Sequence, residues 1–104
     1  MPVVVIATFT VKPESVDTVR DICTKAVAQV HQEPGCQLYS LHESDGAFVF
    51  IEQWADTEAL QAHSTAPAVG ALFAGLSEHL DGAPDIKMLQ PLPAGDAAKG
   101  VLRS

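Results

Sequence analysis

The chain has 104 residues, of which 47% are hydrophobic and 18% are charged, and this composition suits one folded domain. Thirteen acidic residues against six basic ones give a net charge of -7, the wrong sign for binding nucleic acid or an anionic membrane. The N-terminus has no basic signal region and no apolar run long enough to span a bilayer, so we expect a cytoplasmic protein.

The cysteines and histidines do not suggest a metal centre. Cys23 and Cys36 lack a CxxC or metal-ligand spacing, and we interpret them as reduced thiols that pack as small hydrophobic groups. His31, His42 and His79 are scattered and form neither an H-E-x-x-H motif nor a three-ligand cluster. Metal binding is therefore not expected.

The first half of the chain predicts a strand, a helix and a second strand. Residues 3–11 are apolar and mostly β-branched, which indicates a strand covered on both faces. Pro13 can open the helix that follows, and residues 33–35 (Glu-Pro-Gly) end it. Its apolar stripe consists of Val16, Val19, Cys23, Ala26, Val27 and Val30. Residues 36–43 form the second predicted strand.

The second half predicts a hairpin, a helical region and a last strand. Ser-Asp-Gly at 44–46 is a turn signal, and the third strand follows at residues 47–54. Asp56 or Thr57 caps a helix to about residue 64, and Pro67 restarts it toward residue 80. A fourth strand is predicted at 85–92. The tail, residues 93–104, either moves freely or lies across a partner subunit.

The predicted order β-α-β-β-α-β is that of an α+β, ferredoxin-like fold with an antiparallel sheet, here formed by residues 1–92. Two helices cover only one face of such a sheet. Strands one and three are nevertheless apolar on both faces: Val4 and Ile51 point to one face, and their neighbours Val5 and Phe50 point to the other. Because monomers rarely expose such a face, we expect a second copy of the chain to cover it in a homodimer.

Residues 48–63 are where a functional site is expected. Strand alternation places Glu52 on one face of the sheet with Phe48, Phe50 and Trp54. A carboxylate among aromatic rings is costly to bury unless it is paired, protonated or used in chemistry. His63 follows on the next helix.

A family resemblance rests on the same residues. The segment Glu33-Pro-Gly-Cys36 and the pattern Phe50-x-Glu52-x-Trp54-x-Asp56-x-x-Ala59-Leu60-x-x-His63, with Pro67 and Phe73 beyond it, resemble the antibiotic biosynthesis monooxygenase (ABM) domain. The resemblance runs from about Val3 to Leu92. It implies a dimeric α+β barrel and the oxidation of an electron-rich aromatic, such as a quinol, anthrone or polyketide-like molecule, by molecular oxygen without metal or flavin.

His63 and Glu52 are the candidate catalytic residues. His63 is a candidate general base, since imidazole is near neutral at physiological pH; it could equally cap its helix end. Glu52 could act as a base or proton relay if burial raises its pKa. The alternative for Glu52 is a structural role, in a salt bridge or a hydrogen bond to backbone, with Arg20 or the dimer partner as the other group.

The candidate substrate-binding residues are mostly aromatic. Trp54 could stack on a substrate or simply fill the core. Tyr39 could donate its hydroxyl to a substrate oxygen, or face the dimer partner. The remaining candidates, expected as pocket wall or as core, are Phe9, Phe50, Phe73 and Leu76.

Two other functions stay open. Haem-degrading members, as the resemblance would have it, use an Asn on strand one, a Trp on the second helix and an axial His. The corresponding places here fall on Thr8 or Thr10, on His63 and near Phe73, so all three depart from that pattern. The same fold could also bind a small apolar ligand without catalysis, for example in a stress response, since a fold does not determine a function.

Overall fold

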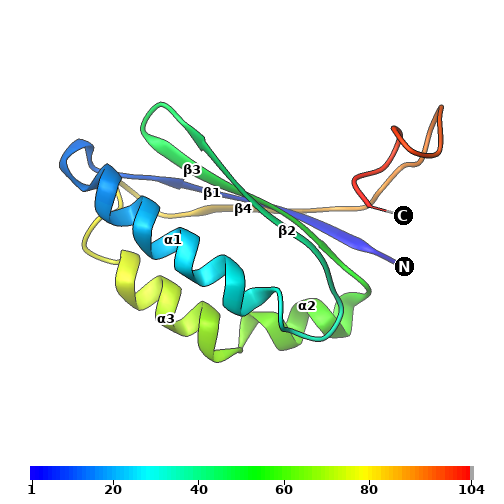
Figure 1. The fold of residues 1–104 in the computed structure, drawn as a ribbon, viewed down its shortest axis with the longest axis horizontal. Coiled ribbons are helices and arrows are strands. Elements are labelled where there is room, and N and C mark those ends of the chain that lie inside the picture. The colour runs from blue at the N-terminus through cyan, green and yellow to red at the C-terminus, as the bar shows by residue number, and fades with distance from the viewer. Residues whose placement is uncertain (104) are drawn as a thin grey trace.

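Four antiparallel strands form one sheet in the order β2-β3-β1-β4 in the computed structural model, which describes residues 1–103. The strands are β1 (Val3–Thr10), β2 (Cys36–Ser44), β3 (Ala47–Trp54) and β4 (Asp85–Leu89). The helices α1 (Val16–Val30), α2 (Thr57–Ser64) and α3 (Pro67–Leu76) lie on one face of this sheet (Figure 1). The predicted α+β, ferredoxin-like fold is therefore confirmed.

The helix-covered face of the sheet carries the aromatic core. In the register of β1 and β3, Val5 pairs with Glu52, Ala7 with Phe50 and Phe9 with Phe48, so these side chains share one face. Every one of them is less than 9% exposed. Helix α1 buries Val19, Cys23, Ala26 and Val30 against them, which is most of the stripe predicted from its spacing.

Two elements are shorter than predicted. Helix α3 ends at Leu76 instead of residue 80, because Leu80 forms a β-bridge with Val11 and the intervening residues turn back toward the sheet. Strand β4 ends at Leu89 instead of residue 92. Leu89 pairs with Val4, near the start of β1, and Pro91 has no N–H to offer a longer ladder.

The outer face of the sheet has no helix over it. Its apolar side chains Ile6, Val49 and Ile51 are only partly buried. The tail reaches one end of this face, where Gln53 Nε2 donates to the backbone oxygen of Arg103 at 2.9 Å. A second copy of the chain over the rest of the face stays a prediction.

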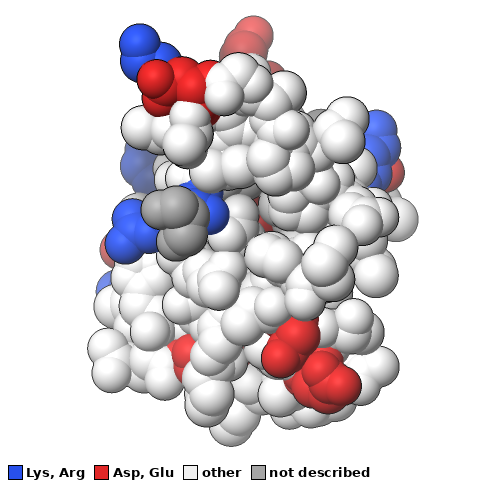
Figure 2. All heavy atoms as spheres, turned by 90° about the vertical axis from the view of Figure 1, so that its right-hand side faces the viewer, with Lys and Arg blue, Asp and Glu red and all other residues white. Residues whose placement is uncertain are grey.

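The end of the molecule where both termini lie is largely uncharged. Figure 2 looks onto this end, and the acidic and basic side chains visible there form small, separate groups among uncharged residues. The net charge of -7 is thus not concentrated on this face. Within residues 1–103, no helix has the length and apolarity that a membrane crossing requires.

Candidate functional site

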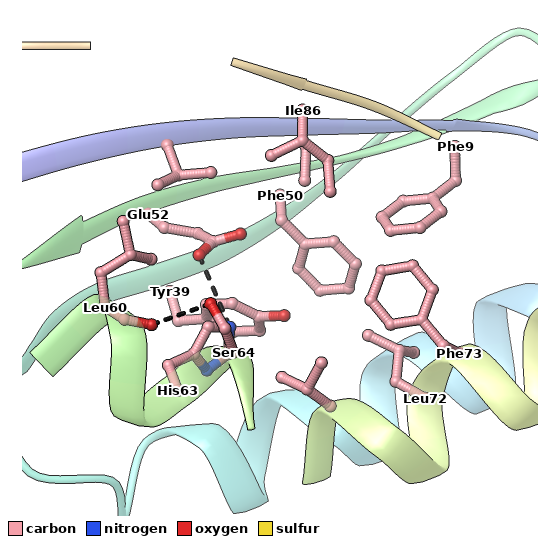
Figure 3. Close-up of a pocket in the computed structure, with 13 residues that line it drawn as sticks. Phe9, Tyr39, Phe50, Glu52, Leu60, His63, Ser64, Leu72, Phe73 and Ile86 are labelled. Atoms are coloured by element: carbon pink, nitrogen blue, oxygen red, sulfur yellow. Dashed lines mark hydrogen bonds and ion pairs between the residues drawn. The ribbon is translucent and has the colours of Figure 1, made fainter. Parts of the chain in front are cut away.

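A cavity of about 210 Å³ lies between the sheet and helices α2 and α3 (Figure 3). Six of the predicted site residues line it: Phe9, Tyr39, Phe50, Glu52, His63 and Phe73. Leu76 and Trp54 do not line it; both are fully buried in the core. The sequence did not single out Leu60, Ser64, Val69, Leu72 and Ile86, which also contribute to the wall.

Helix α2 brings His63 to the polar end of the cavity. Its N-cap is Asp56, whose carboxylate accepts a hydrogen bond from the backbone N–H of Ala59 at 2.8 Å, as the capping pattern predicts. His63 lies in the last turn and is 8% exposed. Its position near a helix end agrees with the capping alternative, but its ring nitrogens face two carboxylates rather than backbone oxygens.

The two ring nitrogens of His63 face different acids. Nδ1 lies 2.7 Å from Glu33 Oε1, a hydrogen bond, whereas Nε2 lies 3.8 Å from Glu52 Oε1. The second distance is too long for a hydrogen bond but short enough for a charge interaction. A substrate hydroxyl placed between Nε2 and Glu52 could therefore bond to both.

Glu52 is almost completely buried, with 4% of its surface exposed. Burial raises its pKa from 4.5 to about 7, the indole of Trp54 opposes this by donating Nε1–H to Oε1 at 3.0 Å, and the charge of Glu33 adds to the rise. The alternative prediction that Glu52 pairs with Arg20 is wrong. Arg20 pairs with Glu43 and Asp17 on the surface. Glu52 is therefore available for proton transfer near neutral pH.

Trp54 lies behind the site rather than in it. Its ring packs against that of His63 with centroids 4.3 Å apart and 31° between the planes. Because it is fully buried and absent from the cavity wall, the structure places it as a support for His63 and Glu52, and not in contact with the cavity where a substrate would lie.

Tyr39 faces the helices and not the outer side of the sheet. Its ring stacks on Phe50 with centroids 4.8 Å apart. Burial, reinforced by the charge of Glu52, raises the pKa of the Tyr39 phenol well above its usual value. Tyr39 thus stays neutral and can donate a hydrogen bond but cannot serve as a base.

The opposite end of the cavity is aromatic. The ring of Phe9 meets that of Phe50 edge-on at 5.9 Å and lies 5.7 Å from that of Phe73. Phe73 is 37% exposed, so it stands where the cavity meets solvent. The cavity therefore has an apolar, aromatic end and an acid–imidazole end, as Figure 3 shows.

Glu33 is the functional candidate that sequence reasoning missed. It follows α1, and its Glu-Pro-Gly context was interpreted only as a helix end and as part of a family motif. The neighbouring Gly35 has φ +78°, and a Cβ there would lie 2.5 Å from Cβ of Ala59. Gly35 thus lets this loop press against α2, which brings Glu33 to His63. No local pattern reveals that contact.

Across residues 1–103, no group of three or more His, Cys, Asp or Glu side chains could hold a metal ion.

Comparisons with known proteins agree with the fold and with the family resemblance. The family model described as antibiotic biosynthesis monooxygenase matches residues 2–75. The Mycobacterium tuberculosis protein named "Putative monooxygenase Rv0793" is 30% identical over 98 residues, which cover 92% of this chain and 97% of that protein. Its solved structure covers 92% of this chain and 100% of its own, with a TM-score of 0.85.

Other solved structures are similarly close. PA3566 from Pseudomonas aeruginosa is 30% identical, with a TM-score of 0.80, and the match covers 88% of this chain and 94% of that one. A conserved protein from Methanosarcina mazei is 26% identical, with a TM-score of 0.82, over 86% of this chain and 92% of that one. The chain therefore belongs to the antibiotic biosynthesis monooxygenase family.

Proposed function

We propose that this protein is a cofactor-independent monooxygenase that oxidises a small electron-rich aromatic, such as a quinol, an anthrone or a polyketide-like molecule, with molecular oxygen. The observation that carries the proposal is the proximity of His63 Nε2 and the Glu52 carboxyl, 3.8 Å apart, at one end of a cavity whose other wall residues are mostly apolar. A base and a weak acid are thereby available at one point of a largely apolar cavity.

The reaction begins with loss of a proton. His63 Nε2 takes a proton from the substrate, and the resulting anion passes one electron to oxygen. The substrate radical and superoxide then combine to form a carbon–oxygen bond. This order suits the site because an anion is a far better one-electron donor than the neutral aromatic, and the polar end can stabilise it.

The reaction balances in atoms and electrons without an added reductant. For an anthrone, the protonated peroxide loses water: the O–O bond breaks, the second hydrogen of the same carbon leaves as a proton, and a carbonyl forms. The substrate supplies every electron, one oxygen atom enters the product and the other becomes water. Glu52, with its pKa raised to about 7, can supply the proton that the peroxide needs.

The shape of the cavity favours a small planar substrate. Its volume of about 210 Å³ is below the roughly 300–1,000 Å³ of pockets that hold drug-sized ligands. The rings of Phe9, Phe50 and Phe73 offer surfaces on which an aromatic substrate can stack. The Tyr39 hydroxyl could donate a hydrogen bond to a substrate oxygen. A haem macrocycle fits this volume less well than a small aromatic molecule does.

Oxygen consumption tests the proposal. Purified, metal-free protein is given a panel of quinols and an anthrone in an oxygen electrode, with autoxidation subtracted. We expect enzyme-dependent uptake that His63→Ala and Glu52→Ala each lower by about 10²–10⁴-fold. Glu58→Ala, an exposed carboxylate on the same helix as His63, is the matched control and should keep full activity.

Circular dichroism establishes that each variant is folded. Uptake that equals autoxidation across the panel would contradict catalysis on these substrates. Saturable binding of the same aromatics without uptake would then favour a ligand-binding protein of the same fold.

A further inference from the structure

We infer that Glu33 is a positioning residue of this site: it holds the His63 imidazole with its proton on Nδ1, so that the Nε2 lone pair faces the cavity. The catalytic consequence rests on the proposed function, whereas the placement of the proton can be measured in the protein alone.

The tautomer follows from which atoms can donate. A carboxylate only accepts hydrogen bonds, so the 2.7 Å contact between Glu33 Oε1 and His63 Nδ1 requires the ring proton on Nδ1. The neutral ring then has no proton on Nε2. That atom points toward Glu52 and the cavity, as the dashed contact in Figure 3 shows, and is free to accept a proton.

The Glu33 carboxylate has no other partner. Its second oxygen, Oε2, is shielded from solvent and makes no hydrogen bond within residues 1–103. A carboxylate that served to cap the loop would accept from nearby backbone N–H groups. Leaving a buried acceptor unsatisfied costs stability, so the hydrogen bond that the Glu33 carboxylate accepts from His63 is the interaction that accounts for the burial of this side chain.

The surroundings hold the His63 ring in one orientation. Trp54 packs on one of its faces, and the ring of Tyr39 lies at 5.6 Å between centroids. The titratable groups facing His63 are Glu33 from the loop after α1, Glu52 from β3 and Tyr39 from β2. None of these is a cation. A 180° turn of the ring about the Cβ–Cγ bond would put a ring carbon at the place of Nδ1 and break the hydrogen bond to Glu33.

Glu33 does not line the cavity, so its role should affect turnover rather than substrate binding. Removing the acceptor in Glu33→Leu leaves the Nδ1 proton without a partner and allows both tautomers. We expect kcat to fall by about 10- to 100-fold with KM little changed. Glu33→Gln replaces a group that only accepts with an amide whose NH2 can donate to Nδ1 and stabilise the other tautomer, so it should not restore the turnover.

Nitrogen-15 NMR of the histidine rings tests the inference without substrate. Spectra are recorded at about pH 8, above the ordinary pKa of histidine, and the His63 signals are those missing in His63→Ala. We expect a protonated Nδ1 and a bare Nε2 in the wild type, a mixture of tautomers in Glu33→Leu, and protonated Nε2 in Glu33→Gln. Glu58→Leu, an exposed site on α2, should match the wild type.

The outcomes separate this inference from the proposed function. A proton on Nε2 in the wild type, or an unchanged tautomer in Glu33→Leu, would overturn the positioning role even if oxygen uptake were found. The expected tautomers without any uptake would uphold the role of Glu33 and contradict the monooxygenase proposal. Because the wild-type spectrum is decisive by itself, poor folding of one variant does not remove the test.

Discussion

His63 Nε2 and Glu52 Oε1 face each other at 3.8 Å without sharing a hydrogen bond. Each is instead held by a different neighbour: Glu33 bonds to the other nitrogen of His63, and Trp54 donates to Glu52. Both groups are therefore held in place, and Glu52 Oε1, which already accepts from Trp54, has a second lone pair that a third group beside His63 Nε2 can use. Such an arrangement is what proton transfer to or from a bound substrate requires.

The buried Glu52 should make the protein less stable as pH rises. Its pKa is higher in the folded protein, about 7, than the ordinary 4.5, so the folded state binds more protons between these values. This contribution is fully present below about pH 4.5 and is lost as pH rises through about 7. The Glu52→Gln variant stays neutral at every pH. The unfolding free energy of this variant minus that of the wild type should therefore rise by up to about 3 kcal/mol as the pH goes from about 4.5 to above 7.

Urea unfolding at about pH 4.5 and pH 8, at one protein concentration, measures this difference. Glu58→Gln, which is exposed, is the control and should follow the wild type at both pH values. If the wild type and Glu52→Gln change in stability by the same amount between the two pH values, burial does not destabilise the Glu52 carboxylate.

Removing the indole N–H should raise the pKa of Glu52 further. The hydrogen bond from Trp54 favours the ionised carboxylate and so lowers the pKa of Glu52, against the effect of burial. Trp54→Phe removes this hydrogen bond, so the pKa of Glu52 should rise above about 7. Carbon-13 NMR of the side-chain carboxyls follows the titration. Glu43 is an internal control, because the guanidinium of Arg20 lowers its pKa and that ion pair is remote from Trp54. A Glu52 pKa that stays the same or falls would argue against the hydrogen bond.

Gly35 should be much less tolerant of alanine than another glycine with a similar backbone. Both Gly35 and Gly46 have positive φ, +78° and +74°, but only at Gly35 would a Cβ meet another side chain, Ala59 at 2.5 Å. We expect Gly35→Ala to cost about 2–4 kcal/mol and Gly46→Ala about 1–2 kcal/mol. Denaturant unfolding compares them. Ala59→Gly should recover part of the loss at Gly35, and equal costs at the two glycines would contradict the steric explanation.

The outer face of the sheet should hold two copies of the chain together. Ile51 lies on this face, next to Ile6 in the register of β1 and β3, and both are partly buried in a single chain. Light scattering should give about twice the chain mass of 11.0 kDa, and Ile51→Glu should shift it toward that of one chain by placing a charge in the interface. Thr18→Glu, at an exposed position on α1, is the control and should leave the mass unchanged. A wild-type monomer at micromolar concentration would contradict the dimer.

Local patterns were enough to predict most of the fold. Strand β3 has the predicted bounds because its alternation is strict and a turn with Gly46 at φ +74° precedes it. The end of α3 was wrong, since Leu80 continues the helical spacing but pairs with Val11 in the folded chain. Spacing within a helix cannot report a partner that lies elsewhere in the sequence.

The site was only partly predictable for the same reason. Alternation along β3 placed Glu52 among aromatic rings, and the capping pattern placed His63 on α2. Glu33, in contrast, lies 30 residues before His63 and meets it only because the loop at Gly35 packs on α2. The position of Trp54 behind the cavity also depends on α2, whose His63 ring packs against the indole.

The chain's single tryptophan lies beside both groups that are expected to exchange protons. The Trp54 ring is 4.3 Å from that of His63, and its N–H is bonded to Glu52. Indole emission responds to charges at such distances, so the intrinsic fluorescence of the protein comes from the site itself. Ligand entry and proton gain there can thus be followed optically, in real time and without a label, even for molecules that are never turned over.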